Sequence, residues 1–215
     1  MDLLISVFVG VPVGILGSLV AWWAMWRVLS VRGSFSNVIC VQEAFAPKEY
    51  RVKFIVDSYR PLMEVEFHGL LFSPGDHGRG GSQPIVAIPL LQSRFAYIGG
   101  KKLRSKKVVN GITALPHRIL VFRPDLIDQV DFERLGAESF VASSESPSQS
   151  SDLLTFLMSR RNSVLEVVCV ASDGYSGSRR AIKSAAYTVN DLVLGEFERG
   201  RSIEYRDAST VQEKE

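Results

Sequence analysis

The chain has little of the residue types that build metal and redox centres, with 2 cysteines and 3 histidines among 215 residues. Cys40 and Cys169 have neither metal-ligand nor redox spacing. His68, His77 and His117 are scattered, without a His or Cys partner at ligand spacing. The sequence therefore predicts no cofactor and no metal site, and in a cytoplasmic domain both cysteines are expected to be reduced and buried.

Motifs for phosphate binding and nucleophilic catalysis are also missing. The glycine-rich segment 75–82 lacks the Gly-Lys-Ser/Thr sequence of a phosphate-binding loop, and a segment containing Pro84 follows it instead of a helix. Residues 174–178, Gly-Tyr-Ser-Gly-Ser, miss the second glycine of a nucleophile elbow. Glu64 and Glu66 share one strand face, as many solvated carboxylates do. With no Ser-His-Asp or Cys-His arrangement, the protein is predicted not to be an enzyme.

The charge balance gives no indication of a nucleic-acid partner, because the net charge is only +2. The charge is nevertheless uneven along the chain. Residues 97–123 include basic residues and no acidic one, whereas acidic residues dominate 124–160. The basic residues concentrate in the run 101–107, Lys-Lys-Leu-Arg-Ser-Lys-Lys.

The first long segment, by contrast, has no charge at all. Residues 3–26 lie between Asp2 and Arg27, and a helix of about 20 apolar residues is enough to cross a bilayer core. A cleaved signal peptide is the alternative, but the start of the chain is acidic and the apolar run is too long. Trp22, Trp23 and Trp26 are typical of an interfacial belt rather than a cleavage site. We expect a retained transmembrane helix.

Basic residues near this segment predict its orientation. Arg27, Arg32, Lys48, Arg51 and Lys53 follow it, and no basic residue precedes it. The positive-inside rule then places the N-terminus outside and the C-terminal domain in the cytoplasm, at the plasma (inner) membrane. The chain has no Asn-x-Ser/Thr glycosylation site, which is compatible with that location.

Small residues recur along the predicted helix. Gly10, Gly14 and Ser18 are four residues apart, a spacing that allows two helices to approach closely. The alternative is that Gly and Pro are simply common in membrane helices, and Pro12 would kink the helix within the motif. These residues predict a possible homo-oligomer.

The rest of the chain has the pattern of a mainly β protein. Period-two alternation predicts strands at 50–56 and 63–71, each with one face on the core and the other face in water. In the second strand, the apolar face consists of Met63, Val65, Phe67, Gly69 and Leu71. Further strands are predicted at 38–41, 85–88, 118–122, 164–170 and 179–183, with one helix at 151–160. The predicted organisation is a transmembrane anchor at 1–30, a β-sandwich at 31–203 and a disordered tail at 204–215.

Two parts of the β-rich region also match a known pattern. Residues 50–58 and 61–67 form a strand, a turn and a second strand; residues 165–170, 175–180 and 187–197 form an apolar strand, a turn with a basic strand, and a closing segment. They resemble the cytoplasmic immunoglobulin-like domain of inward-rectifier potassium channels, which closes on an "isoleucine-leucine-tryptophan-glycine-histidine-arginine-phenylalanine" pattern. The resemblance implies an immunoglobulin-like sandwich held just inside a membrane and assembling around an axis.

The chain departs from that family where conduction is concerned. Residues 192–197, Leu-Val-Leu-Gly-Glu-Phe, lack the tryptophan, histidine and arginine of the closing pattern. The channels need two membrane helices per subunit and a Thr-x-Gly-Tyr/Phe-Gly filter, and this sequence has one candidate helix and no such filter. Potassium conduction is therefore not expected of this chain.

A lipid surface is a candidate partner for the basic residues. A domain that turns the run 101–107 toward the inner leaflet gains about 1 kcal/mol per Lys or Arg near anionic lipid. The alternative is an exposed hairpin tip, or a patch paired with the acidic stretch that follows. The candidate lipid contacts are Arg27, Arg32, Lys101, Lys102, Arg104, Lys106 and Lys107.

Taken together, these patterns predict a non-enzymatic, single-pass membrane protein whose cytoplasmic sandwich serves binding or assembly. Two alternatives stay open. One is an effector that permeabilises the membrane when a soluble sensor domain is triggered, and the other is an accessory subunit of a channel, with a membrane protein as its partner.

Overall fold

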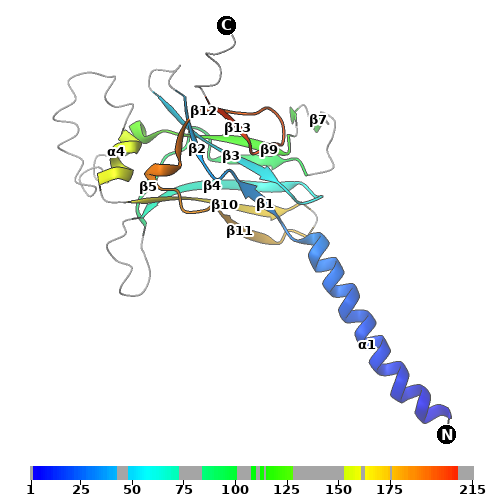
Figure 1. Cartoon of the computed structure of the whole chain (residues 1–215). Coiled ribbons are helices and arrows are strands. Elements are labelled where there is room, and N and C mark those ends of the chain that lie inside the picture. Colours follow the sequence, from blue (N-terminus) through cyan, green and yellow to red (C-terminus); the bar gives the residue numbers. More distant parts are fainter. Residues whose placement is uncertain are drawn as a thin grey trace, which may run out of the picture.

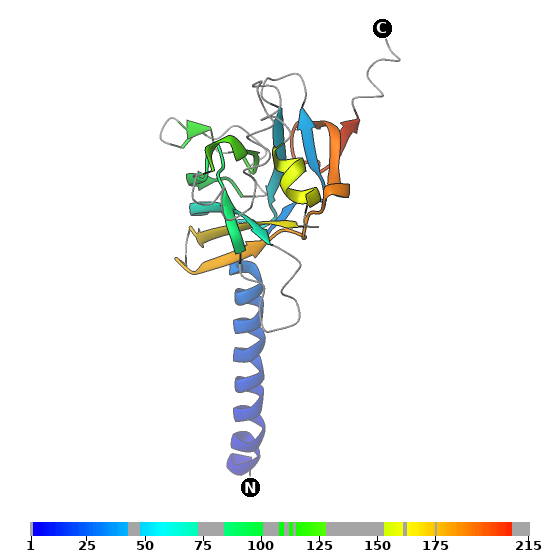
Figure 2. The ribbon, with the colours of Figure 1, turned by 90° about the vertical axis from the view of Figure 1, so that its left-hand side faces the viewer.

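Two β-sheets pack face to face, and a long N-terminal helix projects away from one end of them (Figures 1 and 2). The computed structural model describes residues 2–42, 48–72, 84–100, 108–109, 112–113, 115–127, 153–160, 163–174 and 176–207. Strands dominate these residues, so the predicted mainly β class and sandwich arrangement are confirmed.

The N-terminal helix α1 (Asp2–Leu29) is 28 residues long and includes Pro12. Its side chains are described from Gly10 to Trp26, and all of these residues are exposed. Within the described part of the chain, no helix is long and apolar enough to cross a membrane. The helix predicted at the start of the chain is therefore present. The prediction that it crosses a membrane is not supported by the apolarity of its described residues.

Sheet A is built around the strand β3. Its members are β1 (Gly33–Phe35), β2 (Ile39–Gln42), β3 (Glu49–Val56), β9 (His117–Phe122), β12 (Leu192–Phe197) and β13 (Tyr205–Asp207). One edge of β3 pairs antiparallel with β9, and the other edge pairs with β1 and β2 in turn. β2 then pairs in parallel with β12, which pairs antiparallel with β13.

Sheet B is built in the same way around β4. Its members are β4 (Leu62–Phe72), β5 (Pro84–Ile88), β6 (Arg94–Ile98), β10 (Val164–Asp173) and β11 (Arg179–Lys183). One edge of β4 pairs with β10, and the other edge pairs with β6 and β5 in turn. β11 extends the sheet beyond β10, and both ribbon views place it beside the end of α1 (Figures 1 and 2).

The remaining elements are short. β7 (Val108–Val109) and β8 (Ile112–Thr113) form a small hairpin, and η2 (Pro124–Leu126) and η4 (Val189–Asp191) are single 3-10 turns. The helix α4 (Leu153–Arg160) buries apolar side chains in the core, and the Tyr50 hydroxyl lies 3.0 Å from Thr155 Oγ1 on this helix. α4 thus belongs to the core rather than to a separate unit.

Aromatic side chains join the two sheets. Phe54 of sheet A and Phe67 of sheet B lie edge to face, with ring centroids 5.1 Å apart. Phe35 lies 4.8 Å from Phe54, and Phe95 lies 5.7 Å from Phe67. Such pairs contribute about 0.5–1.5 kcal/mol beyond the area that they bury, so this cluster is a main source of cohesion between the sheets.

A β-bulge changes the face that the start of β4 presents to the core. The pairing shifts from Glu66 opposite Val170 to Met63 opposite Ser172, and Glu64 within the bulge has a positive φ of 50°. Because of this shift, Met63 is 42% exposed. The prediction that Met63 shares the core face of this strand is therefore wrong.

The outer face of β3 is buried as well. The C-terminal strap, defined here as residues 197–207, crosses this face of sheet A. Lys53 is 0% exposed, and its Nζ donates a hydrogen bond of 2.5 Å to the carbonyl of Glu198. Arg201 Nη2 donates to the carbonyl of Val56 at 3.4 Å. The prediction that one face of this strand lies in water is wrong, because the strap covers it.

Each predicted element is present to within a few residues. The predicted segments correspond to β2, β3, β4, β5, β9, β10, β11 and α4. The strands β1, β6, β7, β8, β12 and β13 were not predicted. β13 lies in the segment that was expected to be a disordered tail, where residues 205–207 pair with β12; residues 208–215 lie outside the described part of the chain.

The aromatic cluster gives a first prediction. Replacing Phe67, which is 1% exposed, with Ala should lower the free energy of unfolding by about 3–5 kcal/mol, because it leaves a cavity between the sheets. Met63→Ala on the same strand should cost less than about 1 kcal/mol, since the bulge exposes that side chain. Urea unfolding followed by circular dichroism measures both. Equal losses for the two variants would contradict the bulged register.

Candidate functional site

The predicted helix-packing residues lie on an open surface of α1. Gly10, Gly14 and Ser18 are all exposed, and a Cβ added at Gly10 or Gly14 would meet nothing within 4 Å. The Ser18 hydroxyl donates to the carbonyl of Gly14 at 2.9 Å, so it is satisfied within the helix. Gly10, Gly14 and Ser18 therefore form an open surface on which another helix could pack without rearrangement of α1.

The predicted lipid contacts are mostly beyond what the structure describes. Residues 101–107 lie outside the described ranges, and so does the side chain of Arg27. Arg32 is exposed, and its Nε donates to Ser30 Oγ at 2.9 Å, just after α1. The structure therefore places one residue of the predicted set, at the point where helix and sandwich meet.

The place where α1 joins the sandwich is the most elaborate polar site among the described residues. We call it the junction and define it as the connection 30–32, the β3–β4 turn 57–61 and the β10–β11 turn 173–178. The carbonyl of Arg32 accepts hydrogen bonds from the backbone N–H of Asp57, at 3.0 Å, and of Ser58, at 3.2 Å. The connection that follows the helix is thus bonded directly to the turn that links sheet A to sheet B.

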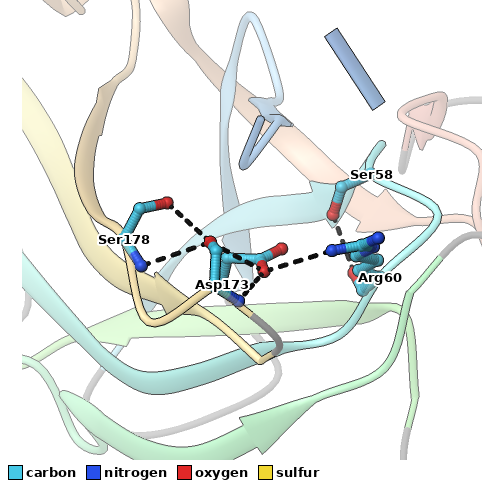
Figure 3. A network of polar contacts seen from close by, with 5 residues as sticks. Ser58, Arg60, Asp173 and Ser178 are labelled. Carbon is cyan, nitrogen blue, oxygen red and sulfur yellow. Dashed lines mark hydrogen bonds and ion pairs between the residues drawn. The ribbon is translucent and has the colours of Figure 1, made fainter. Parts of the chain in front are cut away.

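Asp173 holds the two turns together (Figure 3). Its carboxylate is 1% exposed and lies 3.7 Å from the guanidinium of Arg60. Asp173 Oδ1 also accepts bonds from the backbone N–H of Ser176 at 2.7 Å and from its hydroxyl at 3.0 Å. The Asp173 N–H donates to the carbonyl of Ser178 at 3.0 Å, and Ser58 Oγ donates to the carbonyl of Arg60 at 2.8 Å. The carboxylate is therefore compensated by charge and by hydrogen bonds.

Close backbone packing fixes the β3–β4 turn from a further side. A Cβ at Gly100 would lie 2.6 Å from the carbonyl oxygen of Tyr59 and 2.7 Å from the backbone of Arg60, so this position requires glycine. The Gly174 N–H donates to the carbonyl of Pro61 at 3.2 Å. The turn is thus held by neighbours from β6 and β10 as well as by the helix connection.

A cation–π contact links the last described side chain of α1 to sheet B. The guanidinium of Arg180 on β11 lies 5.2 Å from the ring centroid of Trp26. Arg179 and Lys183 on the same strand are exposed. The edge of sheet B that lies next to the helix is therefore basic.

Burial changes the titration of the two thiols and of one phenol among the described residues. Burial raises the pKa of both Cys40 and Cys169 to about 12, so both thiols are protonated and poorly nucleophilic. Both are buried, as predicted. Burial likewise raises the pKa of Tyr187 to about 12, and its hydroxyl donates to the carbonyl of Ser36 at 2.5 Å. Among the described residues, no group of three or more His, Cys, Asp or Glu side chains could hold a metal ion.

A cavity of about 360 Å³ lies between β4, β5 and η2. Most of the residues that line it have apolar side chains, and the polar side chains are those of His68 and Ser93. The His68 side chain is 51% exposed, in agreement with its predicted place on the polar face of the strand. The volume is at the small end of the range for ligand pockets, and no set of polar side chains converges on it.

Sequence patterns did not identify the junction. Its key contacts join three segments that are far apart in the chain, at residues 32, 57–60 and 173, and four of the hydrogen bonds use backbone atoms only. The available signals were the turn residue Pro61 and the Asp173-Gly174 pair, which predict turns but not their partners. Comparison with known proteins adds no identification: no family model and no curated protein matches the sequence.

The junction gives a second prediction. Asp173→Asn removes the charge opposite Arg60 while keeping the size of the side chain, and it should lower the free energy of unfolding by about 1–3 kcal/mol. Asp125→Asn is the matched control, because Asp125 forms an ion pair with Arg123 in which both side chains are about 30% exposed, at 29% and 33%. That exposed pair should contribute less than about 1 kcal/mol. Thermal unfolding of the two variants compares them directly, and a larger loss for Asp125→Asn would refute the assignment.

Proposed function

We propose that the protein is a non-enzymatic, single-pass membrane protein whose sandwich, immunoglobulin-like in type, serves binding or assembly at the inner face of the plasma membrane. One observation carries the proposal. A 28-residue helix with exposed apolar side chains projects from the sandwich and is hydrogen-bonded to it at its base (Figure 2). Such a surface is unfavourable in water and needs an apolar environment or a partner.

The length of α1 suits a bilayer. A helix of this size is about 42 Å long, and the hydrocarbon core of a membrane is about 30 Å thick. The structure describes the side chains of α1 from Gly10 to Trp26. The apolar character of the whole span follows from the sequence of residues 3–26, which has no charge. Trp22, Trp23 and Trp26 near its C-terminal end would lie at the interface with the headgroups.

The basic edge of sheet B supports an orientation with the sandwich inside the cell. Arg180 contacts Trp26, so the edge of sheet B that β11 forms would lie near the headgroups of the inner leaflet. Arg179, which also lies 3.5 Å from the Glu66 carboxylate, and Lys183 are exposed on the other face of this strand. Each basic residue close to anionic lipid contributes about 1 kcal/mol. Together with Arg32, these residues would form a contact with the lipid surface. Most of the lipid contacts predicted from the sequence lie outside the described ranges.

The junction favours a second candidate, the membrane-permeabilising effector. Its turns connect both sheets to the helix through short polar contacts, so a rearrangement of the sandwich would be passed on to α1. Dye entry into expressing cells separates the two candidates. The effector predicts entry under a triggering condition, whereas the binding or assembly protein predicts none.

Membrane residence is the third prediction. The full chain should stay in the pellet after carbonate washing, and protease added outside sealed cells should leave the sandwich intact, because the bilayer protects it. The double variant Leu16→Arg, Val20→Arg should be released, since each Arg at the centre of a span costs about 2.5–3.5 kcal/mol. Release of the unmodified chain, or its digestion in sealed cells, would end the proposal.

Self-association is the fourth prediction. Gly14→Ile should shift the detergent-extracted protein from an oligomer to a monomer on blue-native electrophoresis, because the new side chain blocks close approach of helices. The open space around Gly14 means that the substitution fits within a single chain. Leu16→Ile on another face of α1 is the control and should leave the oligomer unchanged. A monomer in the unmodified chain and in both variants would exclude assembly through this helix.

A further inference from the structure

The C-terminal strap is fastened to sheet A by a few polar contacts over a buried, positively charged patch. Besides the bond from Lys53 to Glu198, Arg201 lies 3.9 Å from the Asp57 carboxylate. Glu198 in turn lies 3.4 Å from Arg206. β13, the strand within the strap, pairs with β12 through three residues, whereas β9 pairs with β3 along six. The strand ladder that joins the strap to the sheet is therefore half as long as the ladder between β9 and β3.

His117 begins β9 and pairs with Ile55, so its half-buried side chain lies on the same outer face of sheet A as Lys53. Its Nδ1 atom is buried and has no hydrogen-bond partner among the described residues. The charged groups that act on it are Lys53 of β3, Arg118 of β9 and Arg201 of the strap, all of them cations. Among the acids of this region, Asp57 lies against Arg201 and Glu198 lies against Arg206. No acid is among the groups that act on the imidazole.

We propose that the strap is an acid-released cover, which leaves the outer face of sheet A when His117 takes up a proton. On the outer face of sheet A, a protonated imidazole would add a third positive charge to those of Lys53 and Arg201, since the Arg118 side chain points to the other face, toward Phe95. It would also place an N–H donor where the described residues offer no acceptor. The strap carries Arg201, and its strand β13 is paired through three residues only. Its departure separates Arg201 from His117 and admits water to the ring.

The titration of His117 agrees with this geometry. Burial, and then the charges of Lys53, Arg118 and Arg201, hold the pKa of His117 below its ordinary value of 6.5. Once the strap is released, water reaches the imidazole and its pKa returns toward that value, so the open state binds the proton more tightly than the closed one. By linkage, the closed state is favoured at neutral pH and loses its advantage as the pH falls below about 6.5.

Release would uncover two groups that are fully buried at neutral pH. Cys40 pairs with Arg51 and shares the outer face of sheet A with Lys53, and both Cys40 and Lys53 are 0% exposed. Cys169, in contrast, belongs to the core between the sheets. The two cysteines therefore report on different parts of the molecule.

Hydrogen–deuterium exchange of the full chain in detergent tests the proposal. After correction for the intrinsic effect of pH, peptides covering residues 197–207 should exchange several-fold faster at pH 5.5 than at pH 7.5, while peptides from β3 and β10 stay protected. His117→Gln should abolish this difference, because the amide does not titrate in this range. His68→Gln, at the exposed histidine of sheet B, should retain it. Equal exchange of the strap at both pH values, or an undiminished difference in His117→Gln, would overturn the proposal.

Thiol labelling provides a readout that needs no substitution. The rate at which a pyridyl disulfide labels Cys40 is normalised to the rate for the urea-unfolded chain at the same pH, which removes the change in thiolate content. The normalised rate for Cys40 should rise several-fold on acidification, and that for Cys169 should not. A parallel rise at both cysteines would indicate general unfolding instead of strap release and would contradict the proposal.

Discussion

The structure depends on the burial of both faces of β3. Its inner face carries Phe54 into the aromatic cluster that joins the sheets, and its outer face carries Lys53 beneath the C-terminal strap. A strand of this kind cannot shift by one residue, because Lys53 would then enter the apolar core and Phe54 would lie under the strap. Its register therefore fixes the partners β1, β2 and β9 and, through the following turn, the start of sheet B.

The same strand ends at the junction, which connects the core to the helix. The turn after β3 receives the helix connection through the Arg32 carbonyl and meets the β10–β11 turn through Arg60 and Asp173. The polar groups of the junction are used in these contacts, in keeping with a supporting role rather than a chemical one. The function that we propose follows from this arrangement: an apolar helix and a folded module are held as one body, and the basic edge of sheet B lies beside the helix.

Alternation of apolar residues was sufficient to predict the central strands, because those strands are long and their inner residues are large. It failed for Met63, since a bulge adds a residue to one strand without any signal in the composition. It also failed for Lys53, whose charge suggested water although the strap covers it. Short edge strands such as β1 and β13 have too few residues for a period to appear, and the contacts of the junction join distant segments through backbone atoms. The predicted helix-packing residues Gly10, Gly14 and Ser18 lie within one element, so a spacing pattern can suggest them, whereas His117 acquires its cationic surroundings from three separate elements.

The connection between α1 and β1 consists of residues 30–32. Even fully extended, such a stretch spans no more than about 10 Å, and here it is also bonded to a turn of the sandwich. The sandwich therefore stays within a short distance of the end of the helix. Any partner that captures one is brought within molecular contact of the other, and helices that associate side by side bring their sandwiches together at a high local concentration.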